Sequence, residues 1–333
     1  MKKTILITGG SGFIGTDLIS LLETQANINI INIDKSRPIN EKQLGYWTKL
    51  NILDLDGLKQ SLNLSQPDII IHLAARTDTL SDSLMDYIEN TEGTANLIKA
   101  AEGLECLQHI VITSTQYVYK NSQKPFQDVD DDYMPHTVYG KSKVITEELT
   151  RSSNLKCIWT IVRPTNVWGP WHMRYPKELW RMIDKGFYMH PGSEIVIRTY
   201  GYVKNISHQI DSIINASADR VAGKTFYLGD MPIDSYLWLE ALSHRIGVKQ
   251  VKRIPRFIFK SASLVGDALK LANVPFPLYS ERYHNMVEDY IAPTNVTINE
   301  FGLSHPNLQD NVNETITWVE GEGQQFFEYW KNR

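Results

Sequence analysis

The sequence has little cysteine and no long hydrophobic run. Its two cysteines among 333 residues, Cys106 and Cys157, form no C-x-x-C motif and are too sparse for a secreted disulfide scaffold. No stretch approaches the roughly 18 consecutive apolar residues of a membrane span. The apolar run near the N-terminus stops at Thr8, too early for a signal peptide. We therefore expect a cytoplasmic protein without a membrane partner.

Dense blocks of one charge and metal-ligand motifs are also missing. The 34 basic and 38 acidic residues are spread along the chain and give a formal net charge of -4. No basic block is dense enough to follow a nucleic-acid backbone. His72 has no cysteine or carboxylate partner at metal-ligand spacing. We expect neither a nucleic-acid partner nor a bound metal.

Short apolar runs alternate with amphipathic segments through the first half, a pattern typical of βαβ units and a parallel sheet. The predicted strands are 4–8, 28–33, 48–52, 68–73, 109–113 and 158–162, with helices at 12–23, 83–102 and 135–151. The fold class is therefore α/β, with a Rossmann-type doubly wound parallel sheet.

The alternation of strand and helix patterns becomes less regular after Arg163-Pro164, where aromatic, Pro-rich and Gly-containing stretches begin. We predict a Rossmann domain at 1–170, to which segments near 200–230 can return, and a smaller C-terminal α/β substrate-binding lobe at 171–333. Segment 254–272 is basic and partly amphipathic. The favoured interpretation is a helix packed on the second lobe, and a membrane-surface helix is the alternative.

A glycine-rich turn follows the first predicted strand. Gly9, Gly12 and Gly15 recur every third residue, and Phe13 and Ile14 open the next helix. The first glycine permits a tight turn, the second lets a pyrophosphate approach the backbone, and the third lets the helix sit close to the sheet. The helix N-terminus then faces the negative charge. This pattern predicts a dinucleotide site, although such turns alone have many structural uses.

An acidic residue stands at the end of the second predicted strand. Asp34 lies about 20 residues after the last glycine, where a dinucleotide site places an acceptor for the adenosine ribose hydroxyls. A carboxylate there repels a 2′-phosphate, which favours NAD over NADP. Lys35 and Arg37 are close enough in sequence to weaken that exclusion.

Tyr139 and Lys143 are four residues apart on a predicted helix and so share one face. An ammonium about 5 Å from the phenol, at an effective dielectric near 20, favours the phenolate by about 3 kcal/mol. That corresponds to a fall of about two units from the usual tyrosine pKa near 10. Tyr139 is then a candidate general base near neutral pH. Thr115, just after the fifth strand, is placed to hold the reacting oxygen.

Taken together, these motifs resemble the extended short-chain dehydrogenases/reductases of the NAD-dependent epimerase/dehydratase family, over essentially the whole chain. The family contains NAD-dependent enzymes of nucleotide-sugar metabolism. The resemblance implies contacts to the cofactor from Asn51, Ile52, Leu73, Ala74, Ala75, Asn90 and Pro164, besides Tyr139 and Lys143.

The same resemblance implies a nucleotide-sugar substrate. Asn166 matches the family's substrate-contacting asparagine, and Arg198 matches an arginine that grips the nucleotide diphosphate. A guanidinium suits that role because its planar fork pairs with phosphate oxygens. Arg282 is a second phosphate candidate, with a structural role as its alternative. Family members often form homodimers, here through the predicted helices 83–102 and 135–151.

Two substitutions narrow the expected reaction. The family's 4,6-dehydratases carry Asp-Glu, or at least one Glu, after the catalytic Thr or Ser, since elimination of water needs an acid and a base. Gln116 and Tyr117 stand there in this chain, which disfavours dehydration and the related decarboxylation. Lys120, where glycine is usual, and Lys204-Asn205, where Asp-Asp is common, leave the substrate open.

An NAD-dependent epimerase acting at C4 is the favoured interpretation. A 4-keto reductase using NAD(P)H is the main alternative, because it needs the same tyrosine, lysine and threonine. A steroid or lipid alcohol dehydrogenase would need an apolar pocket in place of the Arg198 site. A non-catalytic NAD-sensing protein would commonly lack the Tyr139/Lys143 pair, which is intact here.

Overall fold

The computed structural model describes residues 2–119, 133–271, 274, 276 and 278–331. Two compact units are present. The first comprises Met1–Val167, Gly201–Asp230 and Ala292–Ser304, and the second comprises Trp168–Tyr200, Met231–Ile291 and His305–Arg333. The chain passes between the units in β7 (Asn166–Trp168) and β10 (Tyr200–Tyr202).

The first unit is built on a seven-stranded sheet in the order β11-β6-β5-β4-β1-β2-β3. All its strand pairs are parallel. The strands are β1 (Lys3–Thr8), β2 (Ile28–Asp34), β3 (Trp47–Lys49), β4 (Ile69–His72), β5 (His109–Thr113), β6 (Ile158–Pro164) and β11 (Thr225–Leu228). The predicted doubly wound α/β fold is confirmed.

Two strands differ from the prediction. The third strand was expected at 48–52, but β3 ends at Lys49. Beyond it the Asn51 side chain accepts a hydrogen bond from the Leu53 amide, and Asp54 caps the next helix. These local side-chain bonds turn the chain out of the sheet. The edge strand β11 was not predicted, since its four residues carry too little pattern.

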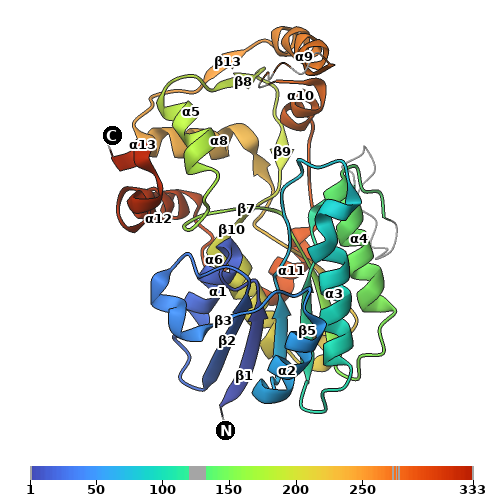
Figure 1. The fold of residues 1–333 in the computed structure, drawn as a ribbon. Coiled ribbons are helices and arrows are strands. Elements are labelled where there is room, and N and C mark those ends of the chain that lie inside the picture. The colour runs from blue at the N-terminus through green and yellow to red at the C-terminus, as the bar shows by residue number, and fades with distance from the viewer. Residues whose placement is uncertain (1, 120–132, 272–273, 275, 277, 332–333) are drawn as a thin grey trace. The chain divides into compact units, whose positions relative to one another are not determined.

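Helices cover both faces of this sheet (Figure 1). Ile5 and Ile7 face α1 (Phe13–Leu22) and α6 (Val203–Asn215), whereas Leu6 faces α2 (Leu55–Ser65) and α3 (Ile88–Ala101). This alternation follows from the two-residue period of a strand. The remaining elements of this unit are η1 (Glu41–Tyr46), η2 (Leu84–Tyr87), η3 (Gln116–Val118), α4 (Val138–Arg151), α7 (Ala218–Val221) and α11 (Thr294–Phe301).

One segment that the sequence analysis left in the second lobe belongs to the first unit. The helix α11 packs on β11, and the rings of Phe301 and Phe226 meet edge to face with their centroids 5.3 Å apart. This apolar contact draws residues 292–304 back to the sheet.

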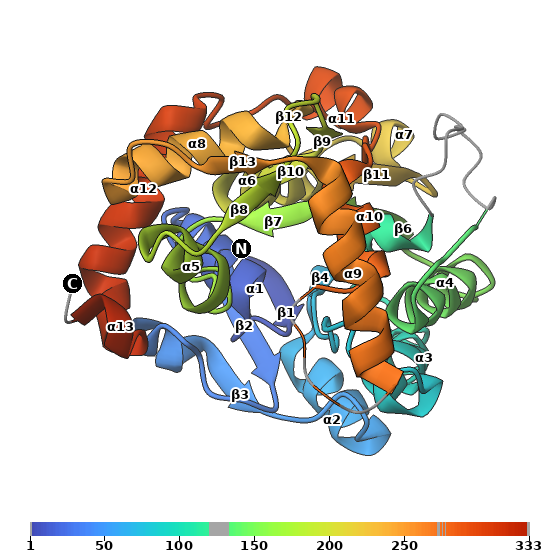
Figure 2. The same cartoon turned by 90° about the horizontal axis from the view of Figure 1, so that it is seen from above.

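The second unit contains short strand pairs and several helices (Figure 2). β8 (Met189–Pro191) pairs in parallel with β13 (Lys252–Ile254), and β9 (Ile197–Arg198) pairs antiparallel with β12 (Ile233–Asp234). The helices are η4 (Pro176–Trp180), α5 (Arg181–Asp184), α8 (Ser235–Ile246), α9 (Arg256–Leu271), α10 (Ser280–Val287), α12 (Leu308–Glu320), η5 (Glu322–Phe326) and α13 (Glu328–Lys331).

Aromatic side chains form much of this unit's core. Trp168 and Trp180 are fully buried, and the Tyr200 ring stacks on Trp238 with the centroids 4.4 Å apart. The helix predicted at 254–272 is present as α9, and Ala272 lies outside the described residues. No helix in the described ranges is long and apolar enough to cross a bilayer.

Candidate active site

The carboxyl ends of β1 and β4 form the first part of the site. These strands are neighbours in the sheet. From β1 the chain adds strands on one side, β2 and β3, and from β4 it adds strands on the other side, β5 and β6, so the strand order reverses between β1 and β4. Ligands of doubly wound sheets bind at such a point. The Gly9 turn and the loop of Leu73, Ala74 and Ala75 both begin here.

The glycine turn is shaped by close backbone contacts. Gly9 has a φ of +75°, and a Cβ on it would lie 2.5 Å from the Ala74 amide nitrogen. A Cβ on Gly15 would lie 2.5 Å from the Gly10 Cα. Gly12 stands at the N-cap of α1 without a side-chain cap, and Phe13 and Ile14 follow it half-buried. Gly12 therefore supplies no side chain to the amides that open α1, which fits a pyrophosphate.

Asp34 ends β2 beside this turn. Its carboxylate accepts hydrogen bonds from the Ser36 amide at 2.8 Å and the Ser11 amide at 3.2 Å. Burial raises the Asp34 pKa, and the two amides and Lys35 oppose that rise. The Lys35 ammonium pairs with Glu89 at 2.7 Å. The Asp34 carboxylate could accept a hydrogen bond from a ribose, and one of the two cations that would weaken the exclusion of a 2′-phosphate, Lys35, is bound to another carboxylate, while Arg37 is exposed.

Other residues predicted to contact the cofactor lie at the carboxyl ends of strands or, in the case of Asn90, on α3. Asn51 and Ile52 follow β3, and Pro164 ends β6 in a buried position. The Asn90 amide group is fully buried: its Oδ1 accepts from the Arg76 amide, and its Nδ2 donates to the Arg76 carbonyl and the Ser142 hydroxyl. Asn90 thus ties the loop after β4 to α4.

The structure brings Thr115, Tyr139 and Lys143 together. Thr115 follows β5, and its side chain lies close enough to the Tyr139 phenol to lower the pKa of that phenol. Lys143 lies one helical turn after Tyr139 and donates to the Thr113 carbonyl at 2.8 Å. All three side chains are buried. A phenol and a hydroxyl placed near each other in this way can hold one substrate oxygen and exchange its proton.

A glycine sets how closely α4 approaches η3. A Cβ on Gly140 would lie 2.3 Å from the Tyr117 carbonyl oxygen, so only glycine fits there. The Thr137 hydroxyl caps the same helix by accepting from the Gly140 amide at 2.9 Å. Tyr139 is therefore positioned by backbone packing and a helix cap.

The expected effect of Lys143 on Tyr139 is wrong in this structure. Burial raises the Tyr139 pKa, and the hydrogen bond to Thr115 only partly opposes that rise. Burial also lowers the Lys143 pKa to about 7, while Glu147 acts in the opposite direction. The helical spacing gave a plausible separation of the two groups but not their desolvation, which disfavours both charged forms.

The sequence analysis did not identify a buried carboxylate, that of Glu147, which lies one helical turn after Lys143. Glu147, on α4, accepts from the Ser114 hydroxyl at 2.5 Å and the Tyr133 phenol at 2.9 Å. The Arg163 guanidinium donates to its two oxygens at 2.8 and 2.7 Å. The Arg163 side chain is 6% exposed and that of Glu147 is 0% exposed. This network holds α4 against β5 and β6.

The predicted substrate residue Asn166 lies near the same centre. The Tyr117 phenol donates to the Asn166 Oδ1 at 3.2 Å, and the Tyr117 ring centroid is 6.3 Å from that of Tyr139. Gln116 precedes it and is buried. Neither position supplies a carboxylic acid to the centre around Tyr139.

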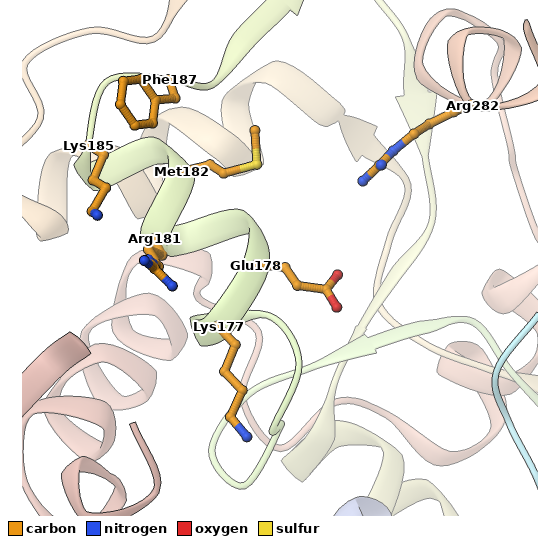
Figure 3. A pocket seen from close by; sticks show the side chains of 7 residues that line it. All are labelled: Lys177, Glu178, Arg181, Met182, Lys185, Phe187 and Arg282. Atoms are coloured by element: carbon orange, nitrogen blue, oxygen red, sulfur yellow. The ribbon is translucent and has the colours of Figure 1, made fainter. Parts of the chain in front are cut away.

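Within the second unit, cationic side chains line a pocket of about 560 Å³. Lys177, Arg181 and Lys185 recur every fourth residue along η4, α5 and the residue after α5, and Arg282 points into the pocket from α10 (Figure 3). Lys177 lies over the Phe327 ring, and Arg181 and Lys185 lie over the Tyr329 ring. Glu178 also lines the pocket and extends toward Arg282 (Figure 3). The pocket has the charge to hold a phosphate or diphosphate.

Arg198 was predicted to grip the nucleotide diphosphate, and in the structure its guanidinium makes hydrogen bonds within the protein. It lies in β9, and its guanidinium donates to the Asn285 carbonyl and to the Glu288 carbonyl, the latter at 3.2 Å. These carbonyls belong to the C-terminal end of α10, where a cation is favourable. Arg198 therefore anchors the helix that carries Arg282.

The model of the NAD dependent epimerase/dehydratase family matches residues 5–229. The chain belongs to this family. The matched region contains the glycine turn, Asp34 and the Thr115, Tyr139 and Lys143 centre, and NAD is the family's cofactor. Arg282 lies beyond it. The described residues hold no group of three His, Cys, Asp or Glu side chains able to bind a metal.

Relatives within the family are named for several reactions. The chain is 32% identical over 217 residues to N-acetyl-alpha-D-glucosaminyl-diphospho-ditrans,octacis-undecaprenol 4-epimerase of Escherichia coli O157:H7, covering 62% of this chain and 61% of that protein. It is 26% identical over 341 residues to UDP-N-acetyl-alpha-D-glucosaminuronate decarboxylase of Bacillus cytotoxicus, covering 96% and 98%.

A solved structure shares the fold at lower identity. UDP-glucose 4-epimerase of Thermotoga maritima, crystallised with UDP-glucose, aligns with a TM-score of 0.72 at 19% identity, covering 96% of this chain and 99% of that one. This similarity shows that nearly the whole chain shares the fold of that structure.

Proposed function

We propose that the protein is an NAD-dependent epimerase that inverts C4 of a nucleotide-diphosphate sugar through a transient ketone. The observation that carries the proposal is the buried group of Thr115, Tyr139 and Lys143, with Gln116 and Tyr117 directly after Thr115. Relatives are named as epimerases, a decarboxylase, dehydratases and a sterol-4-alpha-carboxylate 3-dehydrogenase, so the reaction is inferred from these side chains.

When bound, NAD supplies an acceptor and then a donor of hydride. In its phenolate form, which burial disfavours in the protein without cofactor, Tyr139 would take the proton of the C4 hydroxyl while C4 loses its hydrogen as hydride, which would convert the carbinol to a ketone. Thr115 would hold the oxygen throughout. Tyr139 would then give the proton back to the same oxygen once C4 has regained hydride on its opposite face, which would yield the epimer without net oxidation.

The side chains after Thr115 argue against elimination. Loss of water across C5 and C6 needs a base for the C5 proton and an acid for the leaving hydroxyl. Gln116 is not ionisable, and the Tyr117 phenol is already hydrogen-bonded to Asn166. This leaves Tyr139 to move a single proton at the sugar hydroxyl.

The cationic pocket of the second unit supports a diphosphate-bearing substrate. We expect Arg282→Ala to raise KM for the nucleotide sugar by about tenfold or more, because a charge-assisted hydrogen bond to phosphate is lost. NAD affinity should not change. The control is Arg245→Ala, which removes an arginine that instead pairs with Glu320 at 3.0 Å. Equal losses in both variants would remove the pocket from the proposal.

The direct test uses purified protein and a panel of UDP- and dTDP-sugars followed by NMR, with and without added NADH. Interconversion of C4 epimers without net consumption of cofactor is the expected result. Stoichiometric loss of NADH with a 4-keto sugar would instead assign a reductase. Formation of a 4-keto-6-deoxy product would contradict the argument from Gln116 and Tyr117.

A further inference from the structure

The helix α9 of the second unit is packed on one side only. Its buried residues are Ser263 and Gly266. Gly266 meets the Leu278 carbonyl so closely that no Cβ fits, and Asp267 accepts from the Ser280 amide at 3.0 Å. Small residues thus hold this helix against the segment that leads into α10, which lies beside it (Figure 2).

The opposite side of α9 is apolar and exposed. Phe257, Leu264 and Leu271 are spaced seven residues apart, which places them along one face, and their side chains are 70%, 59% and 89% exposed. Ile258 and Val265 lie beside them and are also exposed. We call these five residues the α9 stripe. A 16-residue helix is about 24 Å long, so the stripe is a continuous apolar surface.

Basic residues predominate in and just before α9. Residues 252–271 hold five basic side chains and one acid, whereas the whole chain carries a formal net charge of -4. Lys260, three residues after Phe257, borders the stripe, and Lys252 lies in β13 just before the helix; both are exposed. Lys270, seven residues after the buried Ser263, lies on the packed face with its ammonium 5.2 Å from the Tyr279 ring centroid, and Arg256 pairs with Glu194 at 3.1 Å. The single acid of the segment, Asp267, is engaged by Ser280. An amphipathic helix with an exposed apolar face and an excess of basic residues has the features of helices that lie in the interface of anionic membranes.

The charge pattern also distinguishes between possible occupants. In a symmetric dimer formed through α9, the second copy would bring the same excess of basic residues and no acid beyond Asp267, which Ser280 already engages. A zwitterionic or neutral surface would leave the cations without counter-charges. An anionic lipid surface matches both features, since its acyl region accepts the stripe and its headgroups pair with the lysines.

We propose that α9 docks the protein peripherally on anionic lipid membranes through the α9 stripe, with the basic residues in and just before α9 adding attraction to the headgroups. The expectation of no membrane partner came from the lack of a long apolar run, which argues against a span but not against a surface helix. The proposal is independent of the assigned reaction.

The test is flotation of the full-length protein with phosphatidylcholine vesicles and with phosphatidylcholine/phosphatidylglycerol vesicles. We expect binding to the anionic vesicles, less binding to the zwitterionic ones, and a loss of binding as salt is raised. The double variant Leu264→Glu/Leu271→Glu should lower the bound-to-free ratio at least about tenfold, because two side chains no longer enter the apolar layer.

The matched control is Leu64→Glu/Leu80→Glu, which alters leucines that are 79% and 85% exposed in the first unit. Its binding should equal that of the unmodified protein, and circular dichroism should show both variants folded. Failure of the unmodified protein to float with anionic vesicles would overturn the proposal, as would equal losses in the two variants. A concentration-dependent dimer abolished only by the α9 substitutions would assign the stripe to self-association instead.

Discussion

The helices α4 and α9 are of similar length, 14 and 16 residues, but α4 buries ionisable side chains whereas α9 exposes apolar ones. The buried face of α4 carries ionisable and hydroxyl groups, including Tyr139, Lys143 and Glu147. The exposed face of α9 carries the apolar stripe. In α4 each buried polar group has a partner, whereas the α9 stripe has none among the described residues. Both helices therefore depart from the usual distribution of apolar side chains inside and charged side chains outside: α4 by burying charged groups and α9 by exposing apolar ones.

Burial of polar groups on α4 makes its geometry demanding. An uncompensated buried charge costs several kcal/mol, so the network around Glu147 permits few alternative arrangements. Exposure of apolar groups on α9 costs much less within the free protein. Substitutions should therefore have large effects on α4 and small ones on α9, unless a membrane is present.

The largest effect is expected at Tyr139. Tyr139→Phe should lower turnover by about 10²–10⁴-fold, because the proton-transfer group is removed. NAD binding, measured by calorimetry, should persist, since the phenol oxygen is not part of the glycine turn. Thr115→Ser, which keeps a hydroxyl beside Tyr139, serves as the control and should retain most activity. Normal turnover in Tyr139→Phe would refute the mechanism.

The next effect concerns the stability of the buried network. Glu147→Ala should reduce the free energy of unfolding by about 3–5 kcal/mol, because Arg163 is left buried without its counter-charge. Glu148→Ala, at the exposed neighbouring position, should change it by no more than about 0.5 kcal/mol. Urea denaturation measures both values. Similar small changes in both variants would show that the ion pair is dispensable.

A pH dependence should arise from Lys143. Its folded-state pKa is about 7, below the value near 10.4 expected in the unfolded chain, so between these values the unfolded state binds more protons. Stability without added NAD should then rise from pH 7 to pH 9, by at most about 1.4 kcal/mol per pH unit from this group.

Substitution isolates that contribution. Lys143→Met should lose this part of the slope, whereas Lys141→Met, at an exposed position on the same helix, should keep it. Urea denaturation at several pH values measures the slope. An unchanged slope in Lys143→Met would mean that the ammonium is not desolvated as the structure indicates.

The smallest effect is expected on the α9 stripe. Leu264→Ala should change the free energy of unfolding by no more than about 0.5 kcal/mol, because this leucine is exposed. Leu97→Ala, in the buried core of α3, should cost about 2–5 kcal/mol. A comparable loss at Leu264 would mean that another part of the protein covers the stripe.

Local spacing explains what the sequence predicted well. Gly9, Gly12 and Gly15 lie close together in the sequence where β1 leads into α1, and Tyr139 and Lys143 are one helical turn apart on α4. The geometry of each set therefore follows from its local backbone. Thr115 was found because it directly follows a strongly apolar strand. Such features need no knowledge of packing between distant segments.

The features that were missed depend on packing between distant residues. In the sequence Glu147 and Glu148 look alike, and only the approach of Arg163 from β6 makes one of them an internal counter-charge. The Tyr139 pKa was predicted in the wrong direction because spacing does not reveal desolvation. The bonds from Arg198 to the end of α10 likewise join residues 87 and 90 positions apart.

The contact between Gly140 and the Tyr117 carbonyl bears on how this site can evolve. It involves only the backbone at position 117, so the side chain there can be exchanged without moving the helix that carries Tyr139. Chemistry at the neighbouring positions can diversify while the hydride-transfer geometry is inherited unchanged. A family containing several reactions on one scaffold is the expected outcome of such a separation.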